Sequence, residues 1–211
     1  MNDWTARLVR LIEKAGESAN VSLTARQINQ LVAYWSVLNR WNAKVNLTSV
    51  PLEPPTAKSV RRLIWEPLLA SQLNFGEPGL WFDLGSGSGS PAIPMKVARP
   101  SLPLCMVESR SRKVAFLREV IRETELQVVE VINSRIEALP GSAASGSVGL
   151  VTMRAVRLTP RIVGTICELV GQSGKVILFG CPDRTPFRDS FSEESFDSKI
   201  SLLTRLSESN V

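Results

Sequence analysis

The chain is most constrained by a short apolar segment that runs directly into a glycine-rich loop. Leu80-Trp81-Phe82-Asp83-Leu84 is a strand candidate, and Gly85-Ser86-Gly87-Ser88-Gly89 follows it at once. Alternate glycines let the chain turn without Cβ clashes and bring its backbone close to a ligand. Where a helix follows such a loop, its first amide groups point into the same space. The segment therefore predicts a ligand cradle at the end of a buried strand.

From Leu80 onward, short apolar runs alternate with helical stretches. Besides the first strand, the strand candidates are Leu102–Glu108, Leu126–Ile132, Val148–Met153 and Lys175–Phe179. The helix candidates between them are Pro91–Ala98, Arg112–Arg122 and Leu158–Val170. This alternation predicts a Rossmann-like α/β fold: a mostly parallel sheet, covered on both faces, with ligands beyond the carboxyl ends of the strands. One more strand is expected near Lys199–Leu206, and the final antiparallel pair is expected to be incomplete.

The first part of the chain is helical. Helices are expected at Asp3–Ala15, at Thr24–Trp41 and at Thr56–Leu73, the last bent at Pro67. Thr24 and Gln27 have the capping-box spacing that starts a helix. We therefore expect two parts, a helical extension over residues 1–75 and an α/β domain over residues 76–211.

The composition excludes several classes of protein. The 211 residues include no His, which removes Ser-His-Asp and Cys-His hydrolysis and His-ligated metals. The cysteines, Cys105, Cys167 and Cys181, are odd in number and lack C-x-x-C spacing, so neither a disulfide framework nor a metal site is expected. No apolar run approaches ~20 residues, so no membrane segment is expected. A soluble protein of the reducing cytoplasm fits these features.

The positive charge is concentrated at the front of the chain. The formal net charge is +5, from 25 Lys and Arg against 20 Asp and Glu. Residues 1–70 hold nine basic and five acidic side chains, a net +4, so the rest of the chain is close to neutral. A basic extension attracts a phosphate-rich partner, although the same excess is common in proteins that bind nothing anionic.

An acidic residue lies at or next to the last position of each of the first two strand candidates. Asp83 precedes the glycine loop, where an acid repels phosphate but suits a cationic ligand end such as the amino group of S-adenosylmethionine. Glu108 closes the second strand, where a carboxylate can accept hydrogen bonds from both ribose hydroxyls. NAD sites use the same carboxylate, so Glu108 predicts an adenosyl ligand without naming it.

Four segments together resemble the RsmG (GidB) family of bacterial S-adenosylmethionine-dependent methyltransferases, which act on guanine N7 of small-subunit ribosomal RNA. The segments are residues 38–48 (LNRWNAKVNLT), 83–94 (DLGSGSGSPAIP), 111–118 (SRKVAFLR) and 153–155 (MRA). The likeness extends over roughly residues 20–180. It implies a class I methyltransferase sheet behind the N-terminal helical extension.

The resemblance also implies roles for individual residues. Gly85, Gly87 and Ser90 would contact the cofactor in the loop, together with Asp83 and Glu108. Ile136 and Glu137 would flank its adenine, and Arg154 would lie at the methyl-transfer site as the catalytic residue. The basic side chains expected to hold substrate RNA are Arg110, Arg112, Lys113 and Arg157, and Arg161, Lys58, Arg61 and Arg62 extend this rim.

The absence of His suits this reaction. Guanine N7 carries a lone pair and no proton, so attack on a sulfonium methyl group needs alignment and exclusion of water but no general base. Trp41 or Trp65 could stack on a base, although their helical spacing also suits a core position.

The chain departs from the family in several places. The family's usual His and Asp-Ser pair are replaced within Arg61–Pro67, and the lysine after the fifth strand is absent at Leu178–Gly180. Both differences lie where RNA is expected.

The leading hypothesis is an rRNA guanine-N7 methyltransferase whose partner is ribosomal RNA or the small ribosomal subunit. The alternatives are a methyltransferase for another RNA or a small molecule, and an inactive cofactor-binding protein that binds RNA or assists assembly. The oligomeric state stays open, a monomer included.

Overall fold

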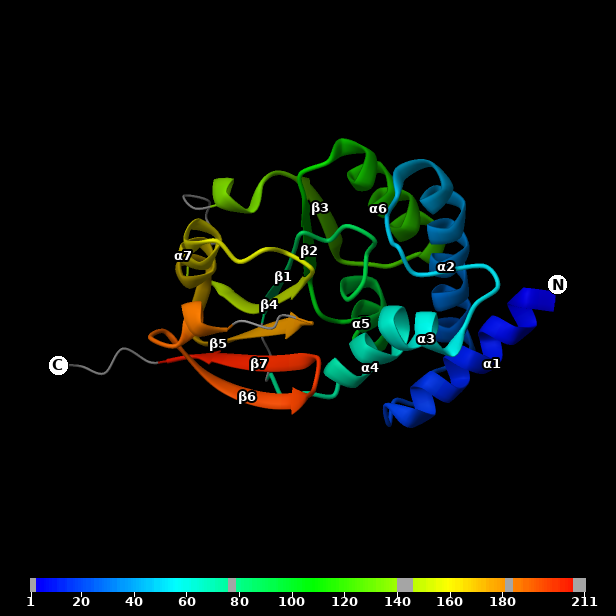
Figure 1. Ribbon diagram of the computed structural model, residues 1–211, viewed down its shortest axis with the longest axis horizontal. Helices are drawn as coiled ribbons and strands as arrows, with labels where there is room; N and C mark the ends of the chain where they lie inside the picture. The colour runs from blue at the N-terminus through cyan, green and yellow to red at the C-terminus, as the bar shows by residue number, and fades with distance from the viewer. Residues whose placement is uncertain (1–2, 76–78, 140–145, 181–183, 207–211) are drawn as a thin grey trace.

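A seven-stranded sheet forms the centre of the computed structural model, which describes residues 3–75, 79–139, 146–180 and 184–206. The strand order is β3-β2-β1-β4-β5-β7-β6 (Figure 1). The strands are β1 Leu80–Leu84, β2 Leu104–Glu108, β3 Val129–Asn133, β4 Val148–Arg154, β5 Val170–Phe179, β6 Phe191–Asp197 and β7 Ile200–Arg205. Strands β1 to β5 are parallel, and β7 runs antiparallel between β5 and β6. The predicted Rossmann-like fold is confirmed.

The expectation of an incomplete antiparallel pair was wrong. The strand predicted near Lys199–Leu206 is β7, and residues 191–197 form the second member of the pair, β6. The segment Phe-Ser-Glu-Glu-Ser-Phe-Asp has a polar composition that does not favour a strand by itself. It is an edge strand, so the ladder that it forms with β7 outweighs its local propensity.

Helices cover both faces of the sheet. The helical elements are α1 Asp3–Ser18, α2 Ala25–Val45, α3 Ala57–Val60, η1 Arg61–Trp65, α4 Glu66–Ala70, α5 Ala92–Ala98, α6 Ser111–Thr124, η2 Ile136–Ala138, α7 Pro160–Leu169 and η3 Thr185–Phe187. The capping box predicted at the start of α2 is present, since Thr24 and Gln27 each accept the other's backbone N–H. Among the residues described, no helix is long and apolar enough to cross a membrane.

Alternation along the strands creates two buried clusters. Trp81 and Met106 point to one face, with residues from α1 to α6, whereas Phe82 and Val107 point to the other, with α7, η2 and η3. Successive strand residues face opposite sides of a sheet, so β1, β2, β4, β5 and β7 each contribute buried residues to both clusters. The result is a three-layer arrangement with the sheet in the middle.

The N-terminal helices pack into the first cluster. Tyr34, Trp35 and Leu38 of α2 are buried there beside residues of β1, α5 and α6. Side chains of α2 also donate to backbone carbonyls of this layer, Gln27 to Val97 at 2.8 Å and Gln30 to Thr124 at 2.8 Å. A domain boundary near residue 75 stays a prediction, but the two parts bury a common cluster.

A wide helical turn replaces the simple bend expected at Pro67. Arg61–Trp65 is a π-helical segment between α3 and α4, and Pro67 follows it. Proline has no N–H to donate to the carbonyls one turn earlier. Two of those carbonyls instead accept from side chains near the sheet, Arg62 O from Arg154 Nη1 at 2.7 Å and Leu63 O from Ser90 Oγ at 3.0 Å. The irregular turn therefore ties the N-terminal helices to the ends of β1 and β4.

Candidate functional site

A cavity of about 250 Å³ lies where the chain leaves the carboxyl ends of β1 and β4. The strand order reverses at this place, because β1 lies between β2 and β4, and open α/β sheets bind ligands at such switch points. We call it the carboxyl-edge cavity. Its lining residues are Leu47, Thr48, Ser49, Arg62, Leu63, Gly85, Ser86, Gly87, Ser88, Ser90, Glu108, Lys113, Arg154 and Ala155.

The glycine loop forms one wall because its backbone adopts conformations that suit glycine. Gly85 has φ +76°, and a Cβ there would meet Val156 at 2.6 Å. Gly89 has φ +81°, and a Cβ there would meet Ile93 at 2.9 Å. Side chains at either position would be strained and would force packed neighbours aside. The loop thus brings bare backbone to the cavity, as the sequence predicts.

Glu108 ends β2 with its carboxylate held in the cavity. Oε2 accepts from the Gly87 N–H at 3.0 Å and Oε1 from the Arg110 N–H at 2.8 Å. The residue is only 7% exposed. Each carboxylate oxygen of Glu108 can still accept a further hydrogen bond. Glu108 therefore presents an oriented acceptor with two available oxygens to the cavity.

Asp83 is buried at the end of β1 and does not line the cavity. Its Oδ1 accepts from Thr152 Oγ1 at 2.6 Å, and Thr152 in turn accepts from Trp81 Nε1 at 2.9 Å. Its Oδ2 has no hydrogen-bond partner among the described residues. Burial raises the pKa of Asp83 to about 6, and the hydrogen bond from Thr152 opposes that rise. A buried acid with an unpaired oxygen fits a cationic or donor group of a ligand.

Arg154, at the end of β4, already uses one guanidinium nitrogen in contacts within the protein. Nη1 lies 2.9 Å from Glu66 Oε2, and the guanidinium carbon lies 4.7 Å from the centre of the Phe179 ring. Burial lowers the pKa of Arg154, and the nearby Glu66 carboxylate opposes that shift. Nε and Nη2 have no partner in the described part of the chain.

The segment Trp41–Thr48 contributes Leu47 and Thr48 to the lining of the carboxyl-edge cavity. Asn42 Oδ1 accepts from the N–H groups of Leu47 and Thr48, both at 2.8 Å. Asn46 caps α2 in the left-handed region at φ 52°, which Asn tolerates well. The two asparagines stop the helix and direct Leu47 and Thr48 toward the cavity.

The other predicted site residues divide between the cavity and its surroundings. Ser90 and Lys113 line the cavity, but the Ser90 hydroxyl is already used by Leu63 O. Ile136 on η2 is buried in the second cluster, and neither it nor Glu137 lines the cavity. The exposed predicted side chains outside the cavity are Arg110 and Arg112 at the start of α6 and Arg157 after β4. Their predicted roles stay predictions.

Several residues of the site had no recognisable sequence signal. Tyr34 Oη donates to Ser88 O at 3.0 Å and so fixes the loop from α2. Burial raises the pKa of Tyr34 well above its ordinary value. Thr152 contributes through its hydrogen bond to Asp83, and Glu66 through its ion pair with Arg154. These partners are far away in the sequence, so a single sequence does not reveal the contacts. The described residues hold no group of three or more His, Cys, Asp or Glu placed to bind a metal ion. Cys181 lies outside them.

The strand order and the glycine-loop site place the chain in the class of proteins that have the Rossmann-like methyltransferase fold. A methyltransferase from Aquifex aeolicus, described as SAM-dependent, superposes with a TM-score of 0.55 at 12% identity, covering 71% of this chain and 93% of that one. A predicted O-methyltransferase from Agrobacterium tumefaciens gives a TM-score of 0.53 at 18% identity, covering 68% and 81%. At these identities the likeness concerns the fold alone.

The chain belongs to the rRNA small subunit methyltransferase G (GidB) family, whose model matches residues 27–183. A relative named ribosomal RNA small subunit methyltransferase G from an Enterobacter species is 40% identical over 134 residues, which is 64% of this chain and 60% of the relative. The relative of the same name from Shigella flexneri is 39% identical over 124 residues, 59% and 58% of the two chains. The chain thus matches about 60% of the length of these curated relatives.

Proposed function

We propose that the chain is an S-adenosylmethionine-dependent methyltransferase that methylates guanine N7 of small-subunit ribosomal RNA in the cytoplasm. The observation that carries the proposal is the carboxyl-edge cavity, where the Gly85–Ser90 loop, the Glu108 carboxylate and the Arg154 guanidinium meet. Family membership supplies the reaction and the substrate class, since the relatives are named for them.

The residues present fit this cofactor. The bare backbone of the loop leaves room for a nucleoside, and Glu108 is oriented by two amides to accept from both ribose hydroxyls. Asp83 is buried near Glu108 and Arg154 without lining the cavity, and its negative charge suits the nearby amino group of the methionine tail and not a pyrophosphate. When bound, S-adenosylmethionine supplies a methyl group on a sulfonium centre.

The protein's part in the reaction is to position the base and exclude water. Guanine N7 attacks through its own lone pair, so no side chain has to remove a proton. The two free donors of Arg154 would orient an acceptor of the base, and Glu66 with Phe179 keeps the guanidinium in place. Lys113 and Arg62 line the same cavity and would bind phosphates on either side of the guanine.

Isothermal titration calorimetry tests the cofactor assignment. S-adenosylmethionine is expected to bind and NAD is not. Glu108→Ala should weaken binding of S-adenosylmethionine by about 1–3 kcal/mol, because two ligand hydroxyls lose their acceptor. Glu168→Ala is the matched control, since Glu168 is an exposed acid of α7 that does not line this cavity. Equal affinity of wild type and Glu108→Ala would remove Glu108 from the site.

Methyl transfer from labelled cofactor tests the reaction. Wild-type protein is incubated with small ribosomal subunits and with deproteinised ribosomal RNA, and N7-methylguanosine is sought by mass spectrometry of the digested RNA. Label at N7 in either substrate is expected. Cofactor binding without transfer to either substrate would instead favour the inactive RNA-binding protein, which the absent lysine after β5 had suggested.

A further inference from the structure

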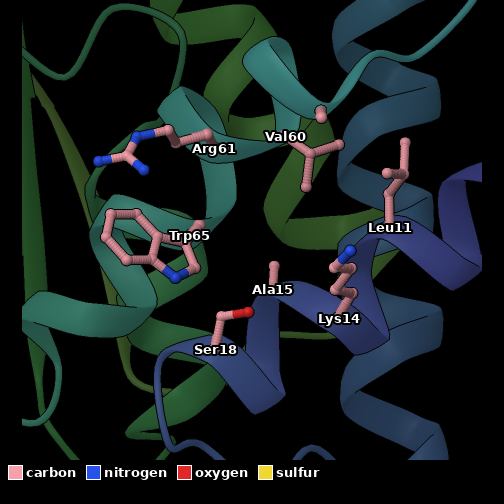
Figure 2. Close-up of a pocket in the computed structure, with 8 residues that line it drawn as sticks. Leu11, Lys14, Ala15, Ser18, Val60, Arg61 and Trp65 are labelled. Atoms are coloured by element: carbon pink, nitrogen blue, oxygen red, sulfur yellow. The ribbon is translucent and has the colours of Figure 1, made fainter.

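A second hollow lies on the N-terminal helices, between α1 and the helical turn that carries η1. Leu11 and Ala15 of α1 face Val60 and Trp65 across it (Figure 2). The cavity measures about 290 Å³, near the lower end of the ~300–1,000 Å³ that small-molecule sites occupy. We call it the Trp65 pocket. Its walls are mostly apolar, and its size suits a single nucleobase or a group of similar volume.

Two cations border the Trp65 pocket. Lys14 stands on the α1 side, and Arg61 lies on the other side with its guanidinium carbon 4.3 Å from the centre of the Trp65 ring (Figure 2). Both side chains are exposed, and neither has a carboxylate within 4.0 Å among the described residues. No acidic residue lines the pocket; Glu13 and Glu17 of α1 border a different hollow. The pocket thus offers two uncompensated positive charges above an apolar floor.

Successive residues of η1 border the Trp65 pocket and the proposed active site. Arg61 borders the Trp65 pocket, and Arg62, the next residue, borders the carboxyl-edge cavity. The Arg62 carbonyl also accepts from Arg154. A strand of RNA that enters the carboxyl-edge cavity would pass this turn, and its phosphates would meet Arg62 and Arg61 in succession.

We infer that the Trp65 pocket binds a nucleotide of single-stranded RNA flanking the methylated base. The phosphates on the two sides of this nucleotide contact Lys14 and Arg61, and the base lies on the apolar floor formed by Leu11, Val60 and the edge of Trp65. Single-stranded RNA is recognised in this way, by cations along the backbone and apolar or aromatic surfaces under the bases. The inference rests on the proposed function, since it takes the substrate to be RNA.

Binding of a fluorescein-labelled single-stranded RNA, measured by anisotropy over a range of salt concentrations, tests the inference. The variant Lys14→Gln/Arg61→Gln removes two phosphate contacts. Because each contact on a single strand contributes about 0.7 to the slope of log K against log salt, the slope should become shallower by about 1.4 and affinity should fall about tenfold near ~0.15 M salt.

The matched control is Arg122→Gln/Arg188→Gln. It removes the same charge at two exposed sites that line neither cavity. This control should keep most of the affinity. A second variant, Ala57→Phe, fills the pocket from an exposed helical position and keeps both cations. It should weaken binding several-fold and leave the salt slope almost unchanged.

Three results would each overturn the inference: equal losses in the two double variants, wild-type affinity in Lys14→Gln/Arg61→Gln, or absence of RNA binding by the wild type. Methyl transfer by the wild type to the same RNA is measured in parallel. If transfer persists while the pocket variants bind normally, only the pocket assignment fails; if transfer is absent with every RNA, the proposed function fails.

Discussion

At the scale of single residues, the site depends on groups whose burial has a cost. Asp83 is 1% exposed and its Oδ2 lacks a partner among the described residues, so its ionised form is less stable in the folded chain than in water. Arg154, near it, has two donors that are likewise unpaired in the part of the chain that the structure describes. Unsatisfied buried groups of opposite charge at a strand end are features that stability alone does not explain. Under the proposed function, the cofactor and the substrate would supply the missing interactions.

Asp83 should make the protein less stable as pH rises. Its pKa is about 6 when folded and 3.8 unfolded, so between these values the folded state binds more protons and unfolding becomes easier with increasing pH. From about pH 4 to pH 7 this group should remove on the order of 2–3 kcal/mol of the unfolding free energy. Asp83→Asn, which has no charge to titrate, should lack that decrease.

Urea unfolding of wild type and Asp83→Asn across this pH range measures the difference. Asp189→Asn is the control, because Asp189 is an exposed acid. It should retain the wild-type decrease. The assignment would be wrong if Asp83→Asn lost stability with pH as steeply as the wild type does.

At the scale of elements, the α3–η1–α4 segment connects the N-terminal helices to the sheet. Its π-helical turn and Pro67 release the carbonyls of Arg62 and Leu63, which then accept from the ends of β4 and of the glycine loop. Glu66 adds an ion pair with Arg154 in which the two side chains are only 5% and 9% exposed. A π-helical turn is rare and often lies at a functional site. Here it holds the guanidinium that borders the proposed reaction.

Glu66→Ala should destabilise the protein strongly. It leaves the Arg154 charge buried without its carboxylate, and breaking a buried pair from one side typically costs about 3–5 kcal/mol. Urea unfolding of Glu66→Ala, Arg154→Ala and the double variant completes a double-mutant cycle. The double variant should be more stable than the sum of the single losses predicts. Strict additivity, or a loss below about 1 kcal/mol in Glu66→Ala, would show that the pair contributes little.

At the scale of the whole molecule, one buried cluster joins the N-terminal helices to the first face of the sheet. Leu38 of α2 is fully buried in that cluster, and Leu169 of α7 is fully buried in the cluster on the other face. Both clusters share the strands between them. The helical part and the sheet should therefore unfold together.

Leu38→Ala should lower the stability of the entire chain by about 2–5 kcal/mol, the usual cost of a cavity in a packed core. Far-UV circular dichroism and tryptophan fluorescence should report one coincident urea transition. Leu169→Ala in the opposite layer should shift the same transition. Two separate transitions, with only the first moved by Leu38→Ala, would instead identify residues 1–75 as an independently folding unit.

The sequence by itself determined the order of strands and helices, the glycine loop and the acids at the ends of β1 and β2. These features are local: strand and helix periodicities, capping pairs and glycines act over a few neighbouring residues. The motif resemblance also indicated the family before any fold was known. The strand at Phe191–Asp197 was missed because its polar residues do not favour a strand by themselves. They form one only by pairing with β7.

The tertiary structure alone decided which side chains meet. Glu66 pairs with Arg154, Ser90 donates to Leu63, Tyr34 holds the loop, and Ile136 turns into the second cluster away from the cavity. Each contact joins residues separated by many others along the chain, so no periodicity records it. Long-range packing sets these distances, and with them the burial that raises the pKa of Asp83 and leaves two donors of Arg154 without a partner among the described residues.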